Sequence, residues 1–260
     1  MVNTRAVDRT GAHVTVNDVS KTYGLRGDSV ESIRSVSFEL PQGEFLSIVG
    51  PSGCGKSTLL MMVAGLLPIT AGTIKVGGQP VAGPRRENSV MFQTPTLFPW
   101  RTVLENVLFP IEVFKGDLGA HKAEAIKLLE MAGLQDFKDR LPEQLSGGMA
   151  QRVSLCRALI TNPELLLMDE PFSALDALTR DDMSLELQRI QERFRKTVVF
   201  ITHSIREAVF LSDRVIVLSP RPAVIVRDLT IDLPRPRTLA VQETPEFNRY
   251  CAEIRAGLGR

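Results

Sequence analysis

The octapeptide Gly-Pro-Ser-Gly-Cys-Gly-Lys-Ser at residues 50–57 matches the phosphate-binding pattern G-x-x-x-x-G-K-[ST] at every position. Such a loop connects a buried strand to a helix, and here an apolar run at residues 44–49 and a helical run at residues 55–67 flank it. Its glycines let backbone N–H groups approach phosphate oxygens, and a helix N-terminus attracts the same anion. The alternative, a glycine-rich turn with a solvated lysine, does not explain these flanks. The residues expected to contact phosphate are Gly50, Pro51, Ser52, Gly53, Cys54, Gly55, Lys56, Ser57 and Thr58.

A second candidate motif is the apolar run at residues 165–168, which ends in Asp169 and Glu170. Buried parallel strands are continuously apolar, and ligands bind outside their carboxyl ends. We therefore expect Asp169 and Ser57 to hold the Mg²⁺ of a nucleotide, and Lys56 to reach its β- and γ-phosphates. Glu170 is a candidate to accept a proton from an attacking water. An acidic helix cap is the alternative, and the phosphate loop makes the functional interpretation the better one.

Short apolar segments alternate with helical patterns along the chain, which predicts an α/β fold. From residue 102 to residue 158 the pattern is helical throughout, and we interpret this block as an insertion in the core. The sequence Pro-Arg-Pro-Arg after Leu233 predicts a boundary before a C-terminal tail. The expected strands cover residues 13–20, 32–40, 44–49, 73–76, 89–92, 165–168, 197–201, 214–218 and 224–226.

The composition excludes several classes of protein. Lys and Arg total 31 against 30 Asp and Glu, so a net charge of +1 gives no electrostatic footprint for nucleic acid. The longest apolar run, residues 59–68, is about half of the roughly 20 residues that a membrane-spanning helix needs, and we expect no signal peptide. Cys54, Cys156 and Cys251 lack paired spacing, which predicts a reducing compartment and no stable metal site before nucleotide binds.

The string Leu-Ser-Gly-Gly-Met-Ala-Gln-Arg at residues 145–152 opens a helical run with a serine and two glycines. Taken by itself, it also fits a serine-capped helix with flexible glycines. The string resembles the signature motif of ATP-binding cassette (ABC) transporter ATPases, with methionine where glutamine is commonest. The resemblance covers about residues 13–233. The other motifs that follow the order and spacing of that family are residues 50–57, 165–170, 173–176 and 202–203.

In that family two nucleotide domains pack head to tail, and each ATP lies between the phosphate loop of one domain and the signature of the other. The resemblance therefore implies that Ser146, Gly147 and Gly148 contact ATP held by a partner copy. It also implies that Asp176 communicates across the dimer. The partner is a second copy of this chain or a paralogue.

The resemblance assigns three further residues to the nucleotide site. Gln93 would sense Mg²⁺ and the attacking water, and His203 would hold the γ-phosphate and orient Glu170. A lone histidine after a strand is often structural, so the role of His203 depends mainly on the family match. Tyr23 resembles the aromatic platform that stacks on adenine, and its alternative is an ordinary core or surface aromatic.

The fold that the resemblance implies is a P-loop (RecA-like) nucleotide-binding core with an antiparallel β subdomain and an inserted α-helical subdomain. We expect a flexible N-terminal segment at residues 1–12 and an ABC ATPase domain at residues 13–233. The helical subdomain is expected at about residues 94–158, and the tail at residues 234–260.

The expected function is ATP hydrolysis that drives a membrane transporter, with ATP and Mg²⁺ as cofactors. DNA-maintenance ATPases share these motifs but separate the loop and the signature by long coiled coils, and translation-associated ABC proteins carry two cassettes. Neither alternative fits this chain as well. Residues 92–107 resemble the import ATPases for nitrate, sulfonates and taurine. The resemblance implies transmembrane permease subunits as partners, a solute-binding protein as an indirect one, and a peripheral location at the cytoplasmic face of the inner membrane.

The segment at residues 97–101 is a candidate dock for the permease. It follows Gln93 closely and contains Trp100, the chain's only tryptophan, beside Leu97, Phe98 and Pro99. Aromatic anchors of this kind dominate interfaces. Core packing of the same cluster is the alternative.

Overall fold

An antiparallel sheet forms one side of the molecule in the computed structural model, which describes residues 12–24, 29–173 and 175–259. Its strands lie in the order β2-β1-β4-β5, and β1 pairs antiparallel with both β2 and β4. Every second side chain of β2 is buried toward its carboxyl end, as expected for a sheet with one solvated face. The strands are β1 (Ala12–Tyr23), β2 (Val30–Pro41), β4 (Ala71–Val76) and β5 (Gln79–Pro80).

The second sheet is mainly parallel and has the strand order β10-β9-β3-β8-β7-β6. Its central strands β3, β7 and β8 are buried at every residue, because helices and the other sheet cover both faces. β10 pairs antiparallel with β9 at one edge. The strands are β3 (Phe45–Val49), β6 (Asn88–Met91), β7 (Leu165–Asp169), β8 (Thr197–Ile201), β9 (Arg214–Leu218) and β10 (Ile225–Thr230).

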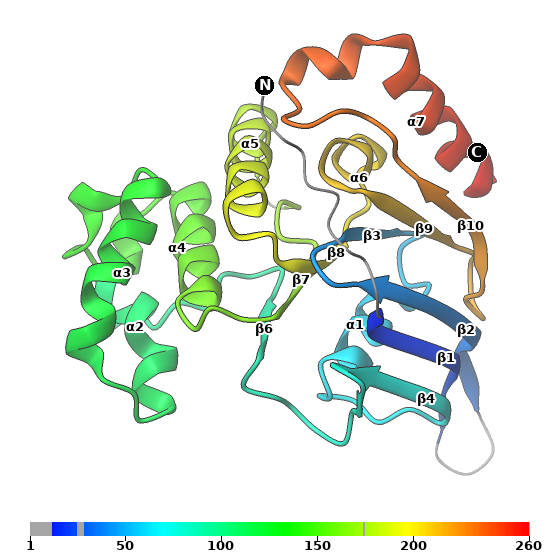
Figure 1. The fold of residues 1–260 in the computed structure, drawn as a ribbon, viewed down its shortest axis with the longest axis horizontal. Coiled ribbons are helices and arrows are strands. Elements are labelled where there is room, and N and C mark those ends of the chain that lie inside the picture. The colour runs from blue at the N-terminus through cyan, green and yellow to red at the C-terminus, as the bar shows by residue number, and fades with distance from the viewer. Residues whose placement is uncertain (1–11, 25–28, 174, 260) are drawn as a thin grey trace.

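Helix α1 (Lys56–Val63) lies between the two sheets, and α5 (Ala177–Phe194) and α6 (Ile205–Leu211) cover the opposite face of the parallel sheet (Figure 1). The apolar side chains of α1 join those of both sheets in one buried cluster. A second cluster joins the parallel sheet to the remaining helices. The parallel sheet is thus packed on both faces.

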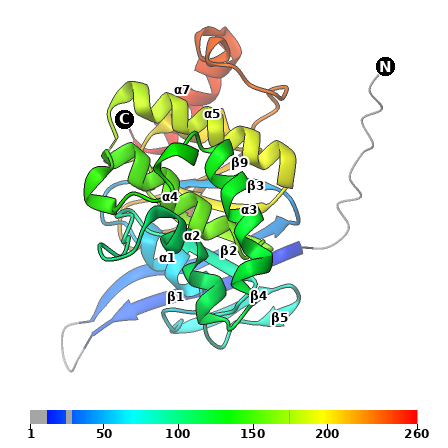
Figure 2. The same ribbon diagram turned by 90° about the vertical axis from the view of Figure 1, so that its left-hand side faces the viewer.

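A helical lobe projects from the strand-rich body on the β6 side of the parallel sheet (Figures 1 and 2). It contains α2 (Val103–Val113), α3 (Leu118–Met131) and α4 (Gly147–Leu159), with short 3₁₀ turns at Gln135–Phe137 and Pro142–Gln144. Thr102 begins α2 with a reciprocal capping box to Glu105. The two sheets and this lobe confirm the expected P-loop core, antiparallel β subdomain and inserted helical subdomain.

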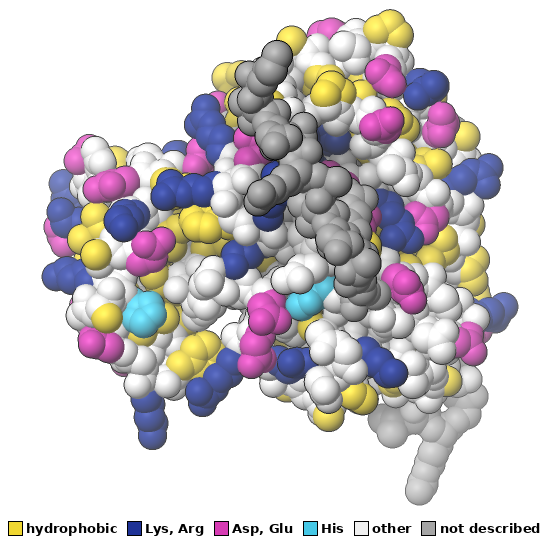
Figure 3. Space-filling view, viewed as in Figure 1, with side chains coloured by type: hydrophobic (Ala, Val, Ile, Leu, Met, Phe, Trp, Pro, Cys, Tyr) yellow, Lys and Arg dark blue, Asp and Glu magenta, His cyan; other side chains and the backbone are white. Residues whose placement is uncertain are grey.

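Charge is distributed evenly over the face shown in Figure 3, where acidic and basic side chains are interspersed. Within the residues that the structure describes, no helix combines the length and the apolar character needed to cross a bilayer. In the same residues, no group of three or more histidine, cysteine or acidic side chains could hold a metal ion. Cys54, Cys156 and Cys251 are free and buried.

The chain after Leu233 packs on the core and does not extend from it. Helix α7 (Pro245–Gly257) buries Phe247, Tyr250 and Ile254 in the same cluster as the parallel sheet. In Figure 1 this helix lies beside β10 and α6. The domain boundary expected after Leu233 remains a prediction. Residues on both sides of it contribute to one hydrophobic core.

Arg237 anchors this C-terminal segment. Its side chain is 2% exposed, and its guanidinium donates to the carbonyl oxygens of Val209, Phe210 and Ser212 at 2.8–2.9 Å. These carbonyls end α6, where the helix dipole favours a cation. Burial lowers the pKa of Arg237 to about 10, and Gln188 of α5 bonds both the N–H and the carbonyl of the same residue.

Replacing Arg237 with methionine should destabilise the whole domain. The methionine fills much of the volume but leaves the carbonyls at the end of α6 without donors, and one unsatisfied buried group costs about 1–3 kcal/mol. We expect a loss of at least about 2 kcal/mol in the free energy of unfolding, measured by urea denaturation. Arg227→Met, on the exposed side of β10, is the matched control. An unchanged midpoint for Arg237→Met would contradict the anchoring role.

Candidate nucleotide-binding and catalytic site

The phosphate loop runs from the end of β3 into the first turn of α1. Gly53 and Gly55 have φ values of 72° and 122°, in the region that favours glycine. A Cβ atom on Gly55 would also lie 3.0 Å from Ser32 Oγ and 3.1 Å from Ile33 Cγ1 of β2. The strand–loop–helix context that the motif requires is therefore present, and the loop packs against the antiparallel sheet.

Lys56 lies inside this loop. Its side chain is 5% exposed, and its Nζ donates to the carbonyl oxygens of Gly50 (3.0 Å) and Pro51 (3.1 Å). The same nitrogen lies 3.9 Å from Glu170 Oε1. The ammonium group thus has partners from the loop itself, and it lies between the loop and the end of β7.

Ser57 and Asp169 meet directly, since Ser57 Oγ donates to Asp169 Oδ1 at 2.9 Å. Burial raises the pKa of Asp169, and the hydrogen bond from Ser57 opposes that shift. A hydroxyl and a carboxylate oxygen are ligands of the kind that Mg²⁺ prefers. The pair therefore fits the metal that accompanies a nucleotide, and the cation would favour the ionised form of Asp169.

Glu170 has partners on β8, on the loop that follows β8 and on α1. Its backbone N–H donates to Ile201 O of β8, and its Oε2 lies 3.1 Å from His203 Nδ1. With a φ of 46°, Glu170 occupies a left-handed conformation that is uncommon for a side-chain-bearing residue. The strained backbone directs the carboxylate toward both Lys56 and His203.

Behind His203 lies a network that the sequence analysis did not identify. Thr202 Oγ1 donates to Glu207 Oε2 at 2.5 Å, and Glu207 Oε1 lies 3.4 Å from Arg180 Nε of α5. Burial raises the pKa of Glu207. The sequence signal for this network is Glu207 itself, an acidic residue in the first turn of α6 that follows closely after His203.

Gln93 follows β6 and reaches the segment after Glu170, because its Nε2 donates to Ser173 Oγ at 3.0 Å. Two side chains hold the chain that follows it. Arg157 of α4 donates to the carbonyls of Pro95 (2.6 Å) and Thr96 (2.9 Å). The buried Asn106 of α2 bonds the backbone of residues 98–102. Gln93 is thus connected firmly to the helical lobe.

Tyr23 ends β1 beside the start of α1, and its hydroxyl lies 3.3 Å from Thr58 Oγ1. Its side chain is 43% exposed, so the ring is accessible at the edge of the phosphate loop. Lys21 Nζ lies 5.1 Å from the centre of the ring. This position agrees with a surface platform and rules out a core aromatic.

The signature residues stand on a different part of the molecule. Ser146 caps α4 by accepting from Met149 N at 3.3 Å, with Gly147 exposed and Gly148 buried behind it. Asp176 caps α5 in the same way, through Thr179 N. In Figure 1, α4 lies in the helical lobe and α1 lies under the parallel sheet, so the structure does not bring the signature to its own phosphate loop.

The candidate dock is exposed at the junction of core and lobe. Trp100 is 73% exposed, and its ring lies 5.5 Å from that of Phe98, which in turn lies 4.4 Å from that of Phe109 on α2. Core packing of Trp100, the alternative interpretation, is therefore wrong. Trp100 thus packs beside the ring of Phe98 and is otherwise largely exposed to solvent.

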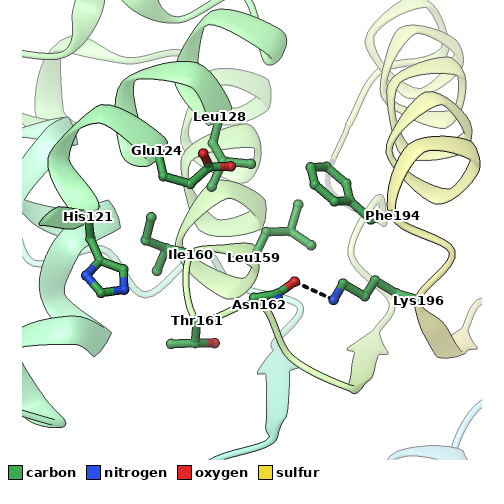
Figure 4. Close-up of a pocket in the computed structure, with 9 residues that line it drawn as sticks. All are labelled: His121, Glu124, Leu128, Leu159, Ile160, Thr161, Asn162, Phe194 and Lys196. Carbon is green, nitrogen blue, oxygen red and sulfur yellow. Dashed lines mark hydrogen bonds between the residues drawn. The ribbon is translucent and has the colours of Figure 1, made fainter. Parts of the chain in front are cut away.

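A hollow of about 400 Å³ lies elsewhere, between α3, the end of α4 and the start of β8 (Figure 4). None of the motif residues lines it, so it is separate from the nucleotide site. Lys196 Nζ closes one side by donating to Asn162 Oδ1 at 2.6 Å. Its lining residues are His121, Glu124, Leu128, Leu159, Ile160, Thr161, Asn162, Phe194 and Lys196.

Comparison with known proteins gives the same picture as the geometry. The family described as ABC transporter matches residues 33–173. An uncharacterised ABC transporter ATP-binding protein of Methanocaldococcus jannaschii is 46% identical over 248 residues, covering 95% of this chain and 92% of the relative. The nitrate import ATP-binding protein NrtD of Synechocystis is 42% identical (93% of each chain), and the taurine import ATP-binding protein TauB of Rhizobium johnstonii is 43% identical (93% and 94%).

Solved structures of an ATP-binding cassette, MJ0796, are also similar to this chain. One is a dimer in a post-hydrolysis state with ADP and Pi, with a TM-score of 0.73 and 32% identity over 85% of this chain and all of the other. A second dimeric structure of the same cassette has a TM-score of 0.74. With its complete phosphate loop, its signature and this structural match, the chain belongs to the ABC transporter family, as one of its ATP-binding ATPase cassettes.

Proposed function

We propose that this chain is the ATP-hydrolysing subunit of an importer for a small oxyanion or sulfonate, and that it works with a separate membrane permease. The names of the relatives NrtD and TauB support import, and nitrate and taurine are both small solutes with an oxyanion group. A permease would hold the chain as a peripheral subunit at the cytoplasmic face of the inner membrane. The second copy or paralogue that the signature requires is supported by the dimeric cassette structures.

The observation that carries the hydrolytic part is the position of Glu170 between Lys56 and His203. In the proposed reaction a water oxygen attacks the γ-phosphorus, the bond to the β–γ bridging oxygen breaks, and Glu170 accepts the water proton. His203 holds the carboxylate of Glu170 in place, and Lys56 exchanges its carbonyl partners for phosphate oxygens. Ser57, Asp169 and Gln93 would hold Mg²⁺, which neutralises phosphate charge when bound.

The separation of the signature from its own phosphate loop supports a composite site formed by two copies. We infer that Ser146, Gly147 and Gly148 contact ATP on the phosphate loop of a partner copy, where α4 presents its N-terminus to the anion. Asp176 would lie at the same interface. Tyr23 would stack on the adenine of the ATP in its own chain, because its accessible ring stands beside Thr58.

Replacing Glu170 with glutamine should slow ATP hydrolysis by about 10²–10⁴-fold, because the amide cannot accept the water proton. Binding of ATP should persist, so that a nucleotide-locked dimer accumulates. Phosphate release and size-exclusion chromatography with ATP measure the two effects. Lys56→Ala is the matched variant: it removes the charge paired with phosphate and should weaken ATP binding as well as hydrolysis. Wild-type turnover in Glu170→Gln would reject Glu170 as the base.

Replacing Trp100 with alanine should weaken assembly with the permease and reduce transport, while the subunit stays folded and hydrolyses ATP. The reason is that Trp100 is exposed on a cluster that Phe98 and Asn106 hold rigidly. Co-purification with the permease and uptake of nitrate or taurine by a complemented deletion strain measure the effect. Leu239→Ala, an exposed apolar residue of the C-terminal segment, is the control. Unchanged assembly and uptake in Trp100→Ala would reject the dock.

A further inference from the structure

The signature helix α4 approaches α5 closely at Gly148, leaving no room for a side chain there. A Cβ atom built on Gly148 would lie 2.4 Å from Thr179 Cγ2, closer than side-chain carbons approach one another, and 3.9 Å from Leu175 Cδ2. A Cβ atom on Gly147 would meet nothing within 4 Å. The two neighbouring signature glycines therefore have different surroundings: Gly148 is buried against α5, and Gly147 is exposed.

The methyl group of Thr179 cannot easily turn away from Gly148. Thr179 Oγ1 donates to Asp176 Oδ2 at 2.7 Å, and Thr179 N donates to Asp176 Oδ1 at 3.0 Å. These two hydrogen bonds lower the pKa of Asp176, which keeps the acceptor ionised. Rotation about χ1 would break the hydroxyl bond, and a β-branched side chain has few other rotamers.

We propose that Thr179 is a positioning residue that fixes the signature motif relative to the Asp176 turn within one chain. Its hydroxyl is held by Asp176, and its methyl group sets how closely the first turn of α4 approaches. This inference rests on the proposed function, in which the signature contacts ATP on a partner copy. On this basis position 148 must be glycine because the methyl group of Thr179 occupies the place of a side chain. Gly147 instead exposes its backbone to the nucleotide.

The same turn of α5 also connects to the catalytic histidine. Arg180 donates to Leu175 O at 2.9 Å and lies 3.4 Å from Glu207, which accepts from Thr202 next to His203. Thr179 thus links the first turn of α5 to the signature, and Arg180 links the same turn to the loop that carries His203. A shift of this turn would move both groups together.

The test is a double-mutant cycle in the full chain, with ATP turnover measured at saturating ATP. Gly148→Ala should reduce turnover by about 10²-fold, the loss expected when a positioned group moves by about 1 Å. Adding Thr179→Ser removes the methyl group but keeps the hydroxyl for Asp176. The double variant should recover at least about tenfold, as expected for side chains in direct contact.

Two controls separate this proposal from other causes. Affinity of Thr179→Ser for a fluorescent ATP analogue should equal that of the unaltered chain, because this variant changes neither the phosphate loop nor the signature. Thr179→Ser should not alter the effect of Gly147→Ala, since no atom of Thr179 lies within 4 Å of a Cβ atom built on Gly147. A double variant as slow as Gly148→Ala would overturn the proposal while leaving the composite site intact.

A second pair of variants keeps the test valid if Gly148→Ala does not fold. Thr179→Val keeps a branched side chain but loses the bond to Asp176, and turnover should fall about tenfold, as expected for one lost hydrogen bond. Thr179→Ser should retain more activity than Thr179→Val, and the reverse order would reject the role of the hydroxyl. Undiminished turnover in both Ser146→Ala and Gly147→Ala would instead reject the proposed function itself.

Discussion

The parallel pairing of β3, β8 and β7 brings the phosphate loop, the acidic pair Asp169 and Glu170, and His203 to one place. Ile48 of β3 pairs with Ile201 of β8, and Ile201 pairs with Asp169 of β7, so the three strands end level with one another. The loops that follow these strands, although far apart in the chain, must therefore leave the sheet at the same carboxyl-terminal end. The phosphate loop, the acidic pair and the histidine loop meet there because of backbone hydrogen bonds between fully buried strands. The side-chain contacts of the site depend on that register.

Much of this arrangement is readable from sequence, because buried strands are short apolar runs and each ends in a recognisable motif. All of the expected strands appear, with ends shifted by a few residues. β5 was missed because it has only two residues, Gln79–Pro80, which carry no apolar alternation. The expected helix at residues 55–67 ends at Val63, where Gly65 takes a φ of 74° and stops it.

The parts that sequence did not reveal are contacts between elements. Arg180, Glu207 and Thr202 lie on three segments, and spacing along the chain cannot indicate that they meet. Arg237 is a similar case, because Pro-Arg-Pro-Arg has the composition of an exposed linker. Its guanidinium is buried only because the end of α6 offers it carbonyl oxygens. The burial of such an arginine can be recognised only from the tertiary structure, because its partners lie on another element.

The anchoring of Arg237 affects how this chain can fold during synthesis. The carbonyls that end α6 remain without their buried donors until residue 237 has been made, and the core stays open until Phe247 and Ile254 arrive. Domains are completed as units, and exposed apolar surface promotes aggregation until then. The core of this domain can therefore close only after the chain has been made as far as Ile254.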